Sequence, residues 1–421
     1  MIHIQDKHNC CGCAACVQAC PKQCISFNED EQGFRYPLVD ESLCIDCGLC
    51  EKVCPVINQA DERKPLKVFA AQNPNEEIRL KSSSGGIFTM LAEAVIDEGG
   101  VVFGAQFDNN WEVEHVFVET KEGLEAFRGS KYLQSRTGET YKQAQDFLKV
   151  GRKVLYSGTS CQIAGLKKFL RKEYKNLITV DVVCHGVPSP LVWRTYLDDF
   201  KKCPKGTTGK NSVCSSLNEM PVITGISFRD KSTGWKKYGF VLRGTSAFTA
   251  DKNTVLSSVN TKEKHDVLLH ETFDKNLFMQ FFLKNLCLRP SCSACPAKSG
   301  KCGSDITLAD FWGISCFYPE FDDDKGTSLV LLGTGKGKRI FDKMKMNTIE
   351  TSYEEGLSHN PSIEKSVKFG KHVSVFWHLF ESNDEKGLTR LLNRLRPSLI
   401  HRQISYIKGI IVKLLRLIHL K

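Results

Sequence analysis

Two runs of cysteines in the chain share one spacing. Each reads CxxCxxCxxxCP, with Cys10, Cys13, Cys16 and Cys20 before Pro21 in the first run and Cys44, Cys47, Cys50 and Cys54 before Pro55 in the second. Three closely spaced thiolates can bind three corners of a 4Fe-4S cubane, whereas the fourth reaches the neighbouring cubane. The spacing therefore predicts two 4Fe-4S clusters, one held by Cys10, Cys13, Cys16 and Cys54 and the other by Cys44, Cys47, Cys50 and Cys20.

This segment resembles the bacterial two-cluster ferredoxins. Small residues between the ligands, such as Gly12 and Gly48, let backbone N–H groups approach the cluster sulfurs. A pair of structural zinc sites is the alternative, but zinc has no use for the third cysteine and the Cys-Pro ending of each run. Cys11 and Cys24 fit neither ligand set, and we interpret Cys11 as an incidental neighbour and Cys24 as core packing.

Cysteine usage also indicates the compartment. The 421 residues include 19 cysteines, and the opening MIHIQDKHNC contains no apolar signal-peptide segment. Thiols that stay reduced in the cytosol usually serve as metal ligands or redox groups, and an odd number argues against complete disulfide pairing. We therefore expect a cytoplasmic redox protein of two or three domains rather than a secreted disulfide scaffold.

The positive charge lies near the C-terminus. Nine Lys or Arg and no acidic residue fall between Lys386 and Lys421, so the rest of the chain is close to neutral despite a net charge of +10. Nucleic-acid binding is not expected, because it needs a basic surface across the fold.

Apolar residues recur at steps of three and four from Arg402 onward, with basic residues largely elsewhere. This pattern predicts a basic amphipathic helix that contacts the inner face of the membrane peripherally, or an acidic partner. A terminal helix packed on its own domain is the alternative. A transmembrane span is not predicted, because charges interrupt every apolar stretch.

Strands and helices alternate after a polar linker at Asn58 to Lys64. We expect strands at 67–71, 101–106, 153–157 and 177–183, and helices at 86–98 and 162–174. This succession predicts an α/β domain with a partly parallel sheet, whose ligand loops lie at the carboxyl ends of the strands.

Three loops in this domain could carry chemistry. Ser82 to Gly86 precedes a helix and could hold a phosphate with backbone N–H groups, although ordinary serine capping is an equal alternative. Cys161 lies in SGTSCQIAG at a strand-to-helix turn, and Cys184 opens CHGVPSP after the next strand. Two cysteines at the ends of successive strands are expected to lie close together.

A third group of cysteines comprises Cys287, Cys292, Cys295 and Cys302, which lead into SDITLADFWGI. Their spacing is compatible with iron-sulfur or zinc and is less specific than the ferredoxin runs.

Several ordered motifs resemble the family of beta subunits of coenzyme F420 hydrogenases and dehydrogenases. They are KSSSGGIFTML, FRGSKYLQS, VLYSGTSCQIAGL, VDVVCHGVPSP, ISFRDKSTGW and CLRPSCSAC leading to SDITLADFWG, between about Val68 and Thr334. The resemblance implies FAD bound by the α/β domain, because a two-electron hydride carrier exchanges with one-electron clusters only through a cofactor stable in three redox states.

The same resemblance implies site residues. Ser83, Ser84, Gly85 and Gly86 are the expected flavin phosphate contacts, with Lys131, Thr159 and Ser160 near the ring or ribityl chain. The family's shared cysteines fall on Cys161, Cys184, Cys292 and Cys295, which implies a third 4Fe-4S cluster and leaves Cys287 and Cys302 as alternative ligands. The family usually has proline where Ser160 stands.

We therefore expect a mixed α+β and α/β architecture. Residues 1–60 would form a two-cluster 4Fe-4S ferredoxin domain, residues 66–350 an F420 hydrogenase/dehydrogenase beta-subunit-like flavin and iron-sulfur domain, and residues 351–421 a helical region with a basic amphipathic tail.

The expected function is that of an oxidoreductase. It would exchange electrons between its clusters and a redox partner protein or small electron carrier and, through FAD, with coenzyme F420 or another substrate. A non-catalytic electron-transfer subunit of a larger complex, linked to cell-surface polysaccharide biosynthesis, is the alternative.

Overall fold

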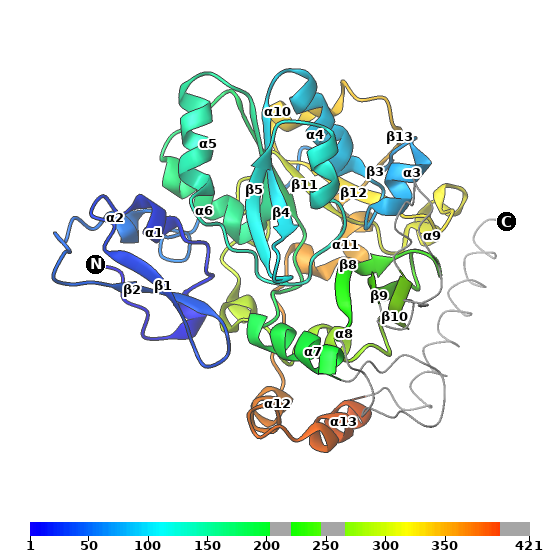
Figure 1. The fold of residues 1–421 in the computed structure, drawn as a ribbon. Coiled ribbons are helices and arrows are strands. Elements are labelled where there is room, and N and C mark those ends of the chain that lie inside the picture. Colours follow the sequence, from blue (N-terminus) through cyan, green and yellow to red (C-terminus); the bar gives the residue numbers. More distant parts are fainter. Residues whose placement is uncertain (203–219, 246–265, 396–421) are drawn as a thin grey trace, which may run out of the picture.

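The computed structural model describes residues 1–202, 220–245 and 266–395, and an eight-stranded sheet forms the centre of the body (Figure 1). In spatial order the strands are β13 (Asn347–Thr351), β3 (Lys67–Gln72), β12 (Ser328–Leu332), β11 (Ile306–Asp310), β7 (Leu177–Val182), β6 (Val154–Thr159), β4 (Val101–Phe107) and β5 (Val113–Val118). The strands and helices expected from the alternating pattern are present, with ends shifted by a few residues.

The middle of this sheet is parallel. β4, β6, β7 and β11 pair in parallel, whereas β5, β12, β3 and β13 join in antiparallel fashion. The register of β6 on β7 runs from Val154 opposite Leu177 to Thr159 opposite Val182. Both strands therefore end at the same edge of the sheet, where the residues that follow them meet.

Helices cover both faces of the sheet, because side chains alternate along each strand. Val154 and Tyr156 of β6 pack with α5 (Thr140–Lys149) and α6 (Ser160–Leu170), whereas Leu155 packs with α4 (Ile87–Asp97) and α10 (Gly335–Phe341). The remaining short helices of the body are α3 (Glu76–Lys81), η2 (Glu122–Phe127), η4 (Pro290–Ala294), α9 (Ile314–Phe317), η5 (Pro319–Phe321), α11 (Tyr353–Ser358) and η6 (Pro361–Ile363).

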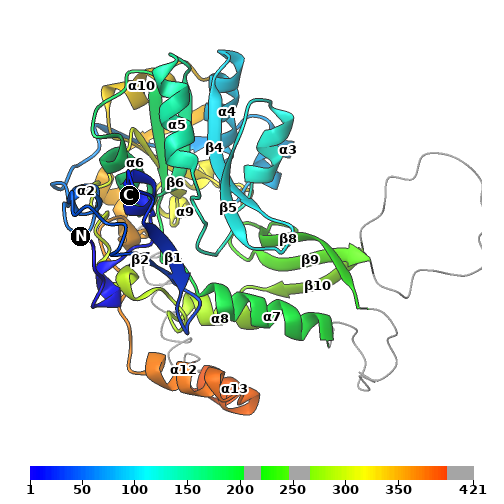
Figure 2. The same ribbon diagram turned by 60° about the vertical axis from the view of Figure 1, so that its left-hand side comes forward.

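The N-terminal cysteine-rich segment packs beside α5 and α6 (Figures 1 and 2). It contains η1 (Lys7–Asn9), α1 (Ala15–Ala19), α2 (Leu49–Lys52) and an antiparallel hairpin of β1 (Ile25–Glu29) and β2 (Arg35–Val39). Left-handed residues, Ala14 at φ 60° and Gly48 at φ 68°, precede the two helices. The left-handed backbone turns each cysteine run back on itself before its third cysteine.

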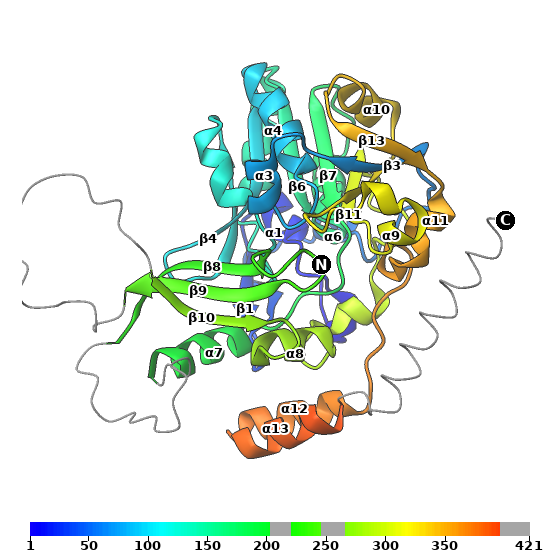
Figure 3. The same cartoon turned by 90° about the vertical axis from the view of Figure 1, so that its right-hand side faces the viewer.

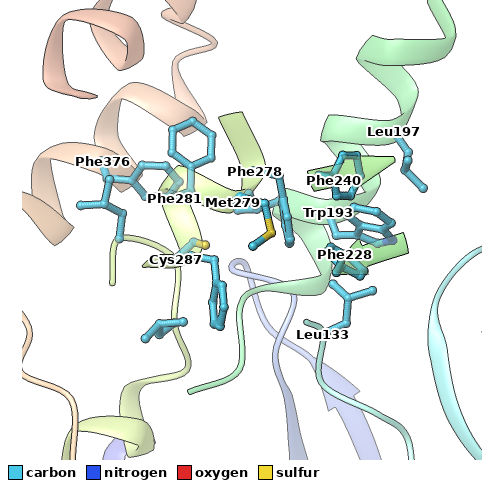
Figure 4. Packing of buried hydrophobic residues seen from close by; sticks show 14 of the residues in the cluster. Leu133, Trp193, Leu197, Phe228, Phe240, Phe278, Met279, Phe281, Cys287 and Phe376 are labelled. Carbon is cyan, nitrogen blue, oxygen red and sulfur yellow. The ribbon is translucent and has the colours of Figure 1, made fainter. Parts of the chain in front are cut away.

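A second layer lies beneath the large sheet (Figure 3). Here β8 (Val222–Asp230), β9 (Gly239–Thr245) and β10 (Asp266–Thr272) form an antiparallel sheet next to α7 (Pro190–Lys202) and α8 (Leu277–Leu283). The helices α12 (His372–Glu381) and α13 (Glu385–Arg394) contribute to the same apolar cluster, and the Phe376 and Phe281 ring centroids are 4.9 Å apart. Trp193, Phe228, Phe240 and Phe278 form its aromatic centre (Figure 4).

The amphipathic helix expected from Arg402 lies outside the described residues, and its membrane contact stays a prediction. Within residues 1–202, 220–245 and 266–395, no helix combines the length and apolar character needed to cross a bilayer.

Removing the indole of Trp193 tests the second layer. This ring is fully buried, packs against Phe228 and Phe278 with centroids 5.2 and 4.9 Å away, and donates from Nε1 to the Trp111 carbonyl at 2.7 Å. We expect Trp193→Ala to lower the free energy of unfolding by about 3–5 kcal/mol because it leaves a cavity. Urea unfolding under anaerobic conditions measures it, and the exposed Val150→Ala serves as the control, with a change of less than about 0.5 kcal/mol. Equal effects of the two substitutions would contradict this packing.

Candidate functional site

The first predicted ligand set converges beside the body of the chain. Cys10, Cys13, Cys16 and Cys54 are all buried. Burial, together with the charges of Cys10 and Cys54, raises the pKa of the Cys16 thiol to about 12. Cys16 and Cys54 also act electrostatically on Cys13. These four thiols therefore face one another, and we refer to their position as site I.

The second set lies on the outer side of the N-terminal segment. Cys20, Cys44, Cys47 and Cys50 line one cavity there, and Cys47 is exposed. Cys24 lines the same cavity, with its Sγ 3.4 Å from that of Cys20. Cys24 is a buried member of the surrounding apolar cluster, as expected, but it also touches a predicted ligand. We call this position site II.

The third set comes from three separate loops. Cys161 is the second residue of α6, Cys184 follows β7, Cys292 lies in η4 and Cys295 caps it. Burial raises the pKa of the Cys184 thiol to about 12, with contributions from Cys161 and Cys295. Burial also raises the pKa of Cys292, and there the charges of Cys184, Cys161 and Cys295 contribute. The fold thus brings these four thiols together, and this is site III.

Cys287 and Cys302 lie outside site III, in two other environments. Cys287 is fully buried in the apolar cluster of the second layer, and its pKa is raised to about 12 by burial. The Cys302 Sγ donates to the Ser304 Oγ at 3.5 Å, close to the Asp181 carboxylate. Over the ranges that the structure covers, no three His, Cys, Asp or Glu side chains converge tightly enough for one metal ion. Cubane ligands surround four irons, so their sulfurs do not meet at one point.

Cys11 lies between site I and site III. Its side chain packs in one buried cluster with Cys13 and Cys161, and the interaction with Cys11, followed by burial, raises the pKa of Cys161 well above its usual range. At Gly165 of α6, an added Cβ would lie 2.9 Å from the Cys13 Sγ, so this helix approaches the cysteine run closely. Cys11 is therefore part of the junction and more than an incidental neighbour of a ligand.

Three hydrogen bonds near the cysteines also join the N-terminal segment to the body. The Gln18 Oε1 accepts from the Tyr141 backbone N–H at 2.9 Å, and the Thr137 hydroxyl donates to the Cys13 carbonyl at 3.2 Å. Gln134 donates from Nε2 to the Cys11 carbonyl at 3.2 Å. The N-terminal segment is thus fastened to the body by the residues that carry its ligands.

Hydrogen bonds and close packing against neighbouring strands hold the serine-glycine loop, Ser82 to Gly86, in place. The Ser84 hydroxyl donates to the Thr327 carbonyl at 2.9 Å, and the Gly85 N–H donates to the Ser328 Oγ at 3.0 Å. An added Cβ at Gly85 would lie 2.4 Å from the Ala71 carbonyl oxygen. Gly86, at φ 79°, is the N-cap of α4.

Ser83 faces a cationic group that the sequence did not single out. Its hydroxyl accepts from the Ser130 N–H at 2.6 Å, and its carbonyl accepts from Arg229 Nη2 at 3.3 Å. Arg229 is buried and paired with Asp310 at 2.8 Å, yet its Nε has no partner among the described residues. Burial lowers the pKa of neighbouring Lys231, whose Nζ donates to the Ser84 carbonyl, to about 7.

Lys131 acts electrostatically on a buried histidine, His115, which contacts β6. Burial lowers the pKa of the Lys131 ammonium to about 7. Burial also lowers the pKa of His115 to about 4, and Lys131 adds to this shift. The His115 Nε2 lies 3.0 Å from the Ser157 carbonyl, just before Thr159. His115 lies on β5 outside every quoted motif, so no local pattern indicated it.

The start of α6 is held by its own side chains. Thr159 forms a capping box with Gln162, and its Oγ1 lies 3.3 Å from the Cys161 Sγ. The Ser160 hydroxyl donates to the buried Asp181 carboxylate at 2.6 Å. Asp181 accepts from Ser304 and Thr307 as well. Serine at this turn thus gains a hydrogen bond that proline could not make.

Family models match three segments of the chain. The 4Fe-4S dicluster domain matches residues 9–58, the N-terminal part of the coenzyme F420 hydrogenase/dehydrogenase beta subunit matches residues 68–140, and its C terminus matches residues 151–355. The two beta-subunit models together cover more than half of the chain. The expected family and the 4Fe-4S dicluster domain are confirmed.

Two similar proteins match the chain beyond its ferredoxin segment. The chain is 27% identical over 386 residues to the coenzyme F420-dependent sulfite reductase of Methanocaldococcus jannaschii, an alignment covering 89% of this chain and 53% of that protein. It is 25% identical over 187 residues to a subunit of the F(420)H(2) dehydrogenase of Methanosarcina mazei, covering 42% of this chain and 53% of that protein. The chain thus spans about half the length of these curated relatives.

A chain of the F420-reducing NiFe hydrogenase complex from Methanosarcina barkeri superposes with a TM-score of 0.43 at 17% identity, covering 73% of this chain and 97% of that chain. The family assignment rests on the sequence models. The chain belongs to the family of coenzyme F420 hydrogenase/dehydrogenase beta subunits and carries a 4Fe-4S dicluster domain ahead of the two beta-subunit segments.

Proposed function

We propose that the chain is an iron-sulfur flavoprotein oxidoreductase that passes electrons between 4Fe-4S clusters and, through FAD, coenzyme F420 or a similar hydride carrier. The observation that carries the proposal is the packing of the first cysteine run against the start of α6, where Cys11, Cys13 and Cys161 share one buried cluster and Gly165 closely approaches the Cys13 Sγ. We infer that two cysteine sites packed against each other in this way exchange electrons directly.

The exposure of the cysteines supports an order along the route. Cys47 of site II is exposed, whereas the four thiols of site I are buried beside α6. A redox partner protein can therefore approach site II. We infer that electrons enter or leave there, pass through site I, and reach site III in the body of the chain.

The donor set of each site fits iron-sulfur clusters. Every site offers four thiols with no competing histidine or carboxylate among the proposed ligands, which are Cys10, Cys13, Cys16 and Cys54 for site I, Cys20, Cys44, Cys47 and Cys50 for site II, and Cys161, Cys184, Cys292 and Cys295 for site III. Thiolate ligands are those that 4Fe-4S clusters require.

The surroundings of Ser83 fit the charge of a flavin diphosphate. Arg229 and Lys231 donate to carbonyls of this loop, and Lys131 follows Ser130, whose N–H donates to the Ser83 hydroxyl. The buried Arg229 Nε lacks a partner among the described residues. We propose that Ser83, Gly86, Lys131 and Arg229 hold the FAD phosphates, and that Ser84 and Gly85 shape the loop. Thr159 and Ser160, next to Cys161, would lie on the site III side of the ring. FAD, when bound, supplies the conversion between one hydride and two single electrons.

Coenzyme F420 is the proposed hydride carrier because the names of two relatives include it.

Reduced F420 added to the anaerobic holoprotein should bleach the cluster absorbance through FAD. Cluster reduction by dithionite without any reduction by F420 would restrict the chain to electron transfer inside a larger complex.

Iron content distinguishes the ligands of site III from the other cysteines. We expect Cys292→Ala to remove roughly one third of the iron and acid-labile sulfide, because one of three clusters is lost. Cys287→Ala is the matched control, since it removes a buried thiol from the same segment, and it should leave the iron content unchanged. The reverse result would contradict the three-loop ligand set.

Flavin content tests the cofactor. Protein purified anaerobically from cells supplied with flavin should release FAD on denaturation, at close to one equivalent per chain, when the supernatant is analysed by chromatography. Protein that contains all its iron but releases no flavin would contradict the flavoprotein assignment while leaving the cluster route intact.

The pH dependence of FAD binding tests Lys131. Because burial lowers its pKa to about 7, the ammonium is charged at pH 6 and mostly neutral at pH 8. Wild-type protein should bind FAD roughly tenfold more weakly at pH 8, the difference between a charged and a neutral hydrogen bond. Titration calorimetry of Lys131→Met should show weak binding without this pH dependence, and exposed Lys121→Met should behave like the wild type. Equal slopes in all three proteins would exclude Lys131 as a contact.

A further inference from the structure

Arg289 is a fully buried arginine at the junction of the N-terminal segment and the body. It precedes η4, and its carbonyl accepts from the Cys292 N–H at 2.9 Å. Its own N–H donates to the Val187 carbonyl at 2.9 Å. The backbone of Arg289 is thus part of the loop that carries two proposed ligands of site III.

The guanidinium reaches across the junction to site I. Its Nε donates to the Cys10 carbonyl at 2.8 Å, and its Nη2 donates to the Cys10 Sγ at 3.5 Å and to the Arg35 carbonyl at 2.9 Å. The Nη1 donates to the Gln134 Oε1 at 2.9 Å. The Tyr36 ring lies beneath the guanidinium, 4.3 Å from its Cζ. Every nitrogen of the side chain is therefore bonded and its position is fixed.

Among the residues that the structure describes, the charge of Arg289 has no carboxylate partner. In the parts of the chain that the structure covers, no ion pair joins Arg289 to Asp or Glu. A buried charge without compensation costs several kcal/mol, so native proteins pair such groups. The guanidinium instead contacts the sulfur of Cys10, a proposed ligand of site I.

We propose that Arg289, held by the loop that carries two proposed ligands of site III, is the counter-charge of the cluster at site I and raises its reduction potential. This inference rests on the proposed function, because it needs iron at site I. A one-electron reduction makes a cluster more negative, so a fixed positive charge nearby favours the reduced state. The electron that leaves one cluster enters the other, and the guanidinium keeps its proton throughout.

A redox titration of the holoprotein followed by EPR tests the proposal. In Arg289→Gln, the ratio of reduced to oxidised cluster at a fixed potential should fall at least tenfold at site I, a shift of about 59 mV for one electron. Arg136→Gln is the matched control, since Arg136 pairs with Asp108 and Glu112 and has no contact with a proposed ligand. It should leave the potentials unchanged.

A second variant covers the case in which Arg289→Gln loses its clusters. Gln134→Glu places a carboxylate on Arg289 Nη1 and compensates the charge without removing the arginine. The potential of site I should again fall. Potentials equal to the wild type in Gln134→Glu, or in Arg289→Gln with full iron, would overturn the proposal, whereas Arg289→Lys should recover part of the shift.

These readouts separate the inference from the proposed function. The cluster potentials are read from the EPR signals of the clusters and need no added flavin, F420 or partner protein. Wild-type protein that contains no iron would end the proposed function as a whole. If the wild type contains all its iron but neither substitution changes the potentials, only the proposed role of Arg289 is contradicted.

Discussion

The close packing of the first cysteine run against the start of α6 is the constraint on which the rest of the structure depends. Gly165 leaves room for Cys13 to approach the helix, and Cys11 packs in the same buried cluster as Cys13 and Cys161. A cluster domain joined by a flexible linker would have to dock for every electron. Here the domain is fastened by hydrogen bonds at Gln18, Thr137 and Gln134, so the distance between sites I and III is fixed.

The parallel centre of the sheet supplies the other side of that junction. Because β6 and β7 run in the same direction, Cys161 and Cys184 leave the sheet at one edge. The η4 loop then brings Cys292 and Cys295 to the same edge from more than a hundred residues further along the chain. Site III thus depends on the fold, and its four thiols meet only after the sheet has formed.

The sequence predicted the features that depend on local spacing. The ferredoxin runs, the alternating strands and the meeting of Cys161 with Cys184 all follow from short-range patterns. Contacts across the fold could not be predicted, since Arg289 and Cys10 lie 279 positions apart. His115 and Arg229 are similar, because each gains its role from a neighbour on another strand. At Gly85 the sequence pattern cannot distinguish two causes. Both a phosphate-binding loop and close packing on the Ala71 carbonyl require glycine at this position.

Direct electron exchange between clusters at sites I and III is the central claim. EPR spectra of the fully reduced holoprotein test it most directly, because two paramagnetic clusters at short range broaden and split each other's signals. Clusters at sites I and II also interact with each other, so Cys292→Ala, which keeps those two clusters, supplies the reference spectrum. We predict additional broadening and splitting of the site I signal in the wild type that is absent from Cys292→Ala. A fully reduced wild-type spectrum equal to the Cys292→Ala spectrum plus that of one isolated cluster would contradict the claim.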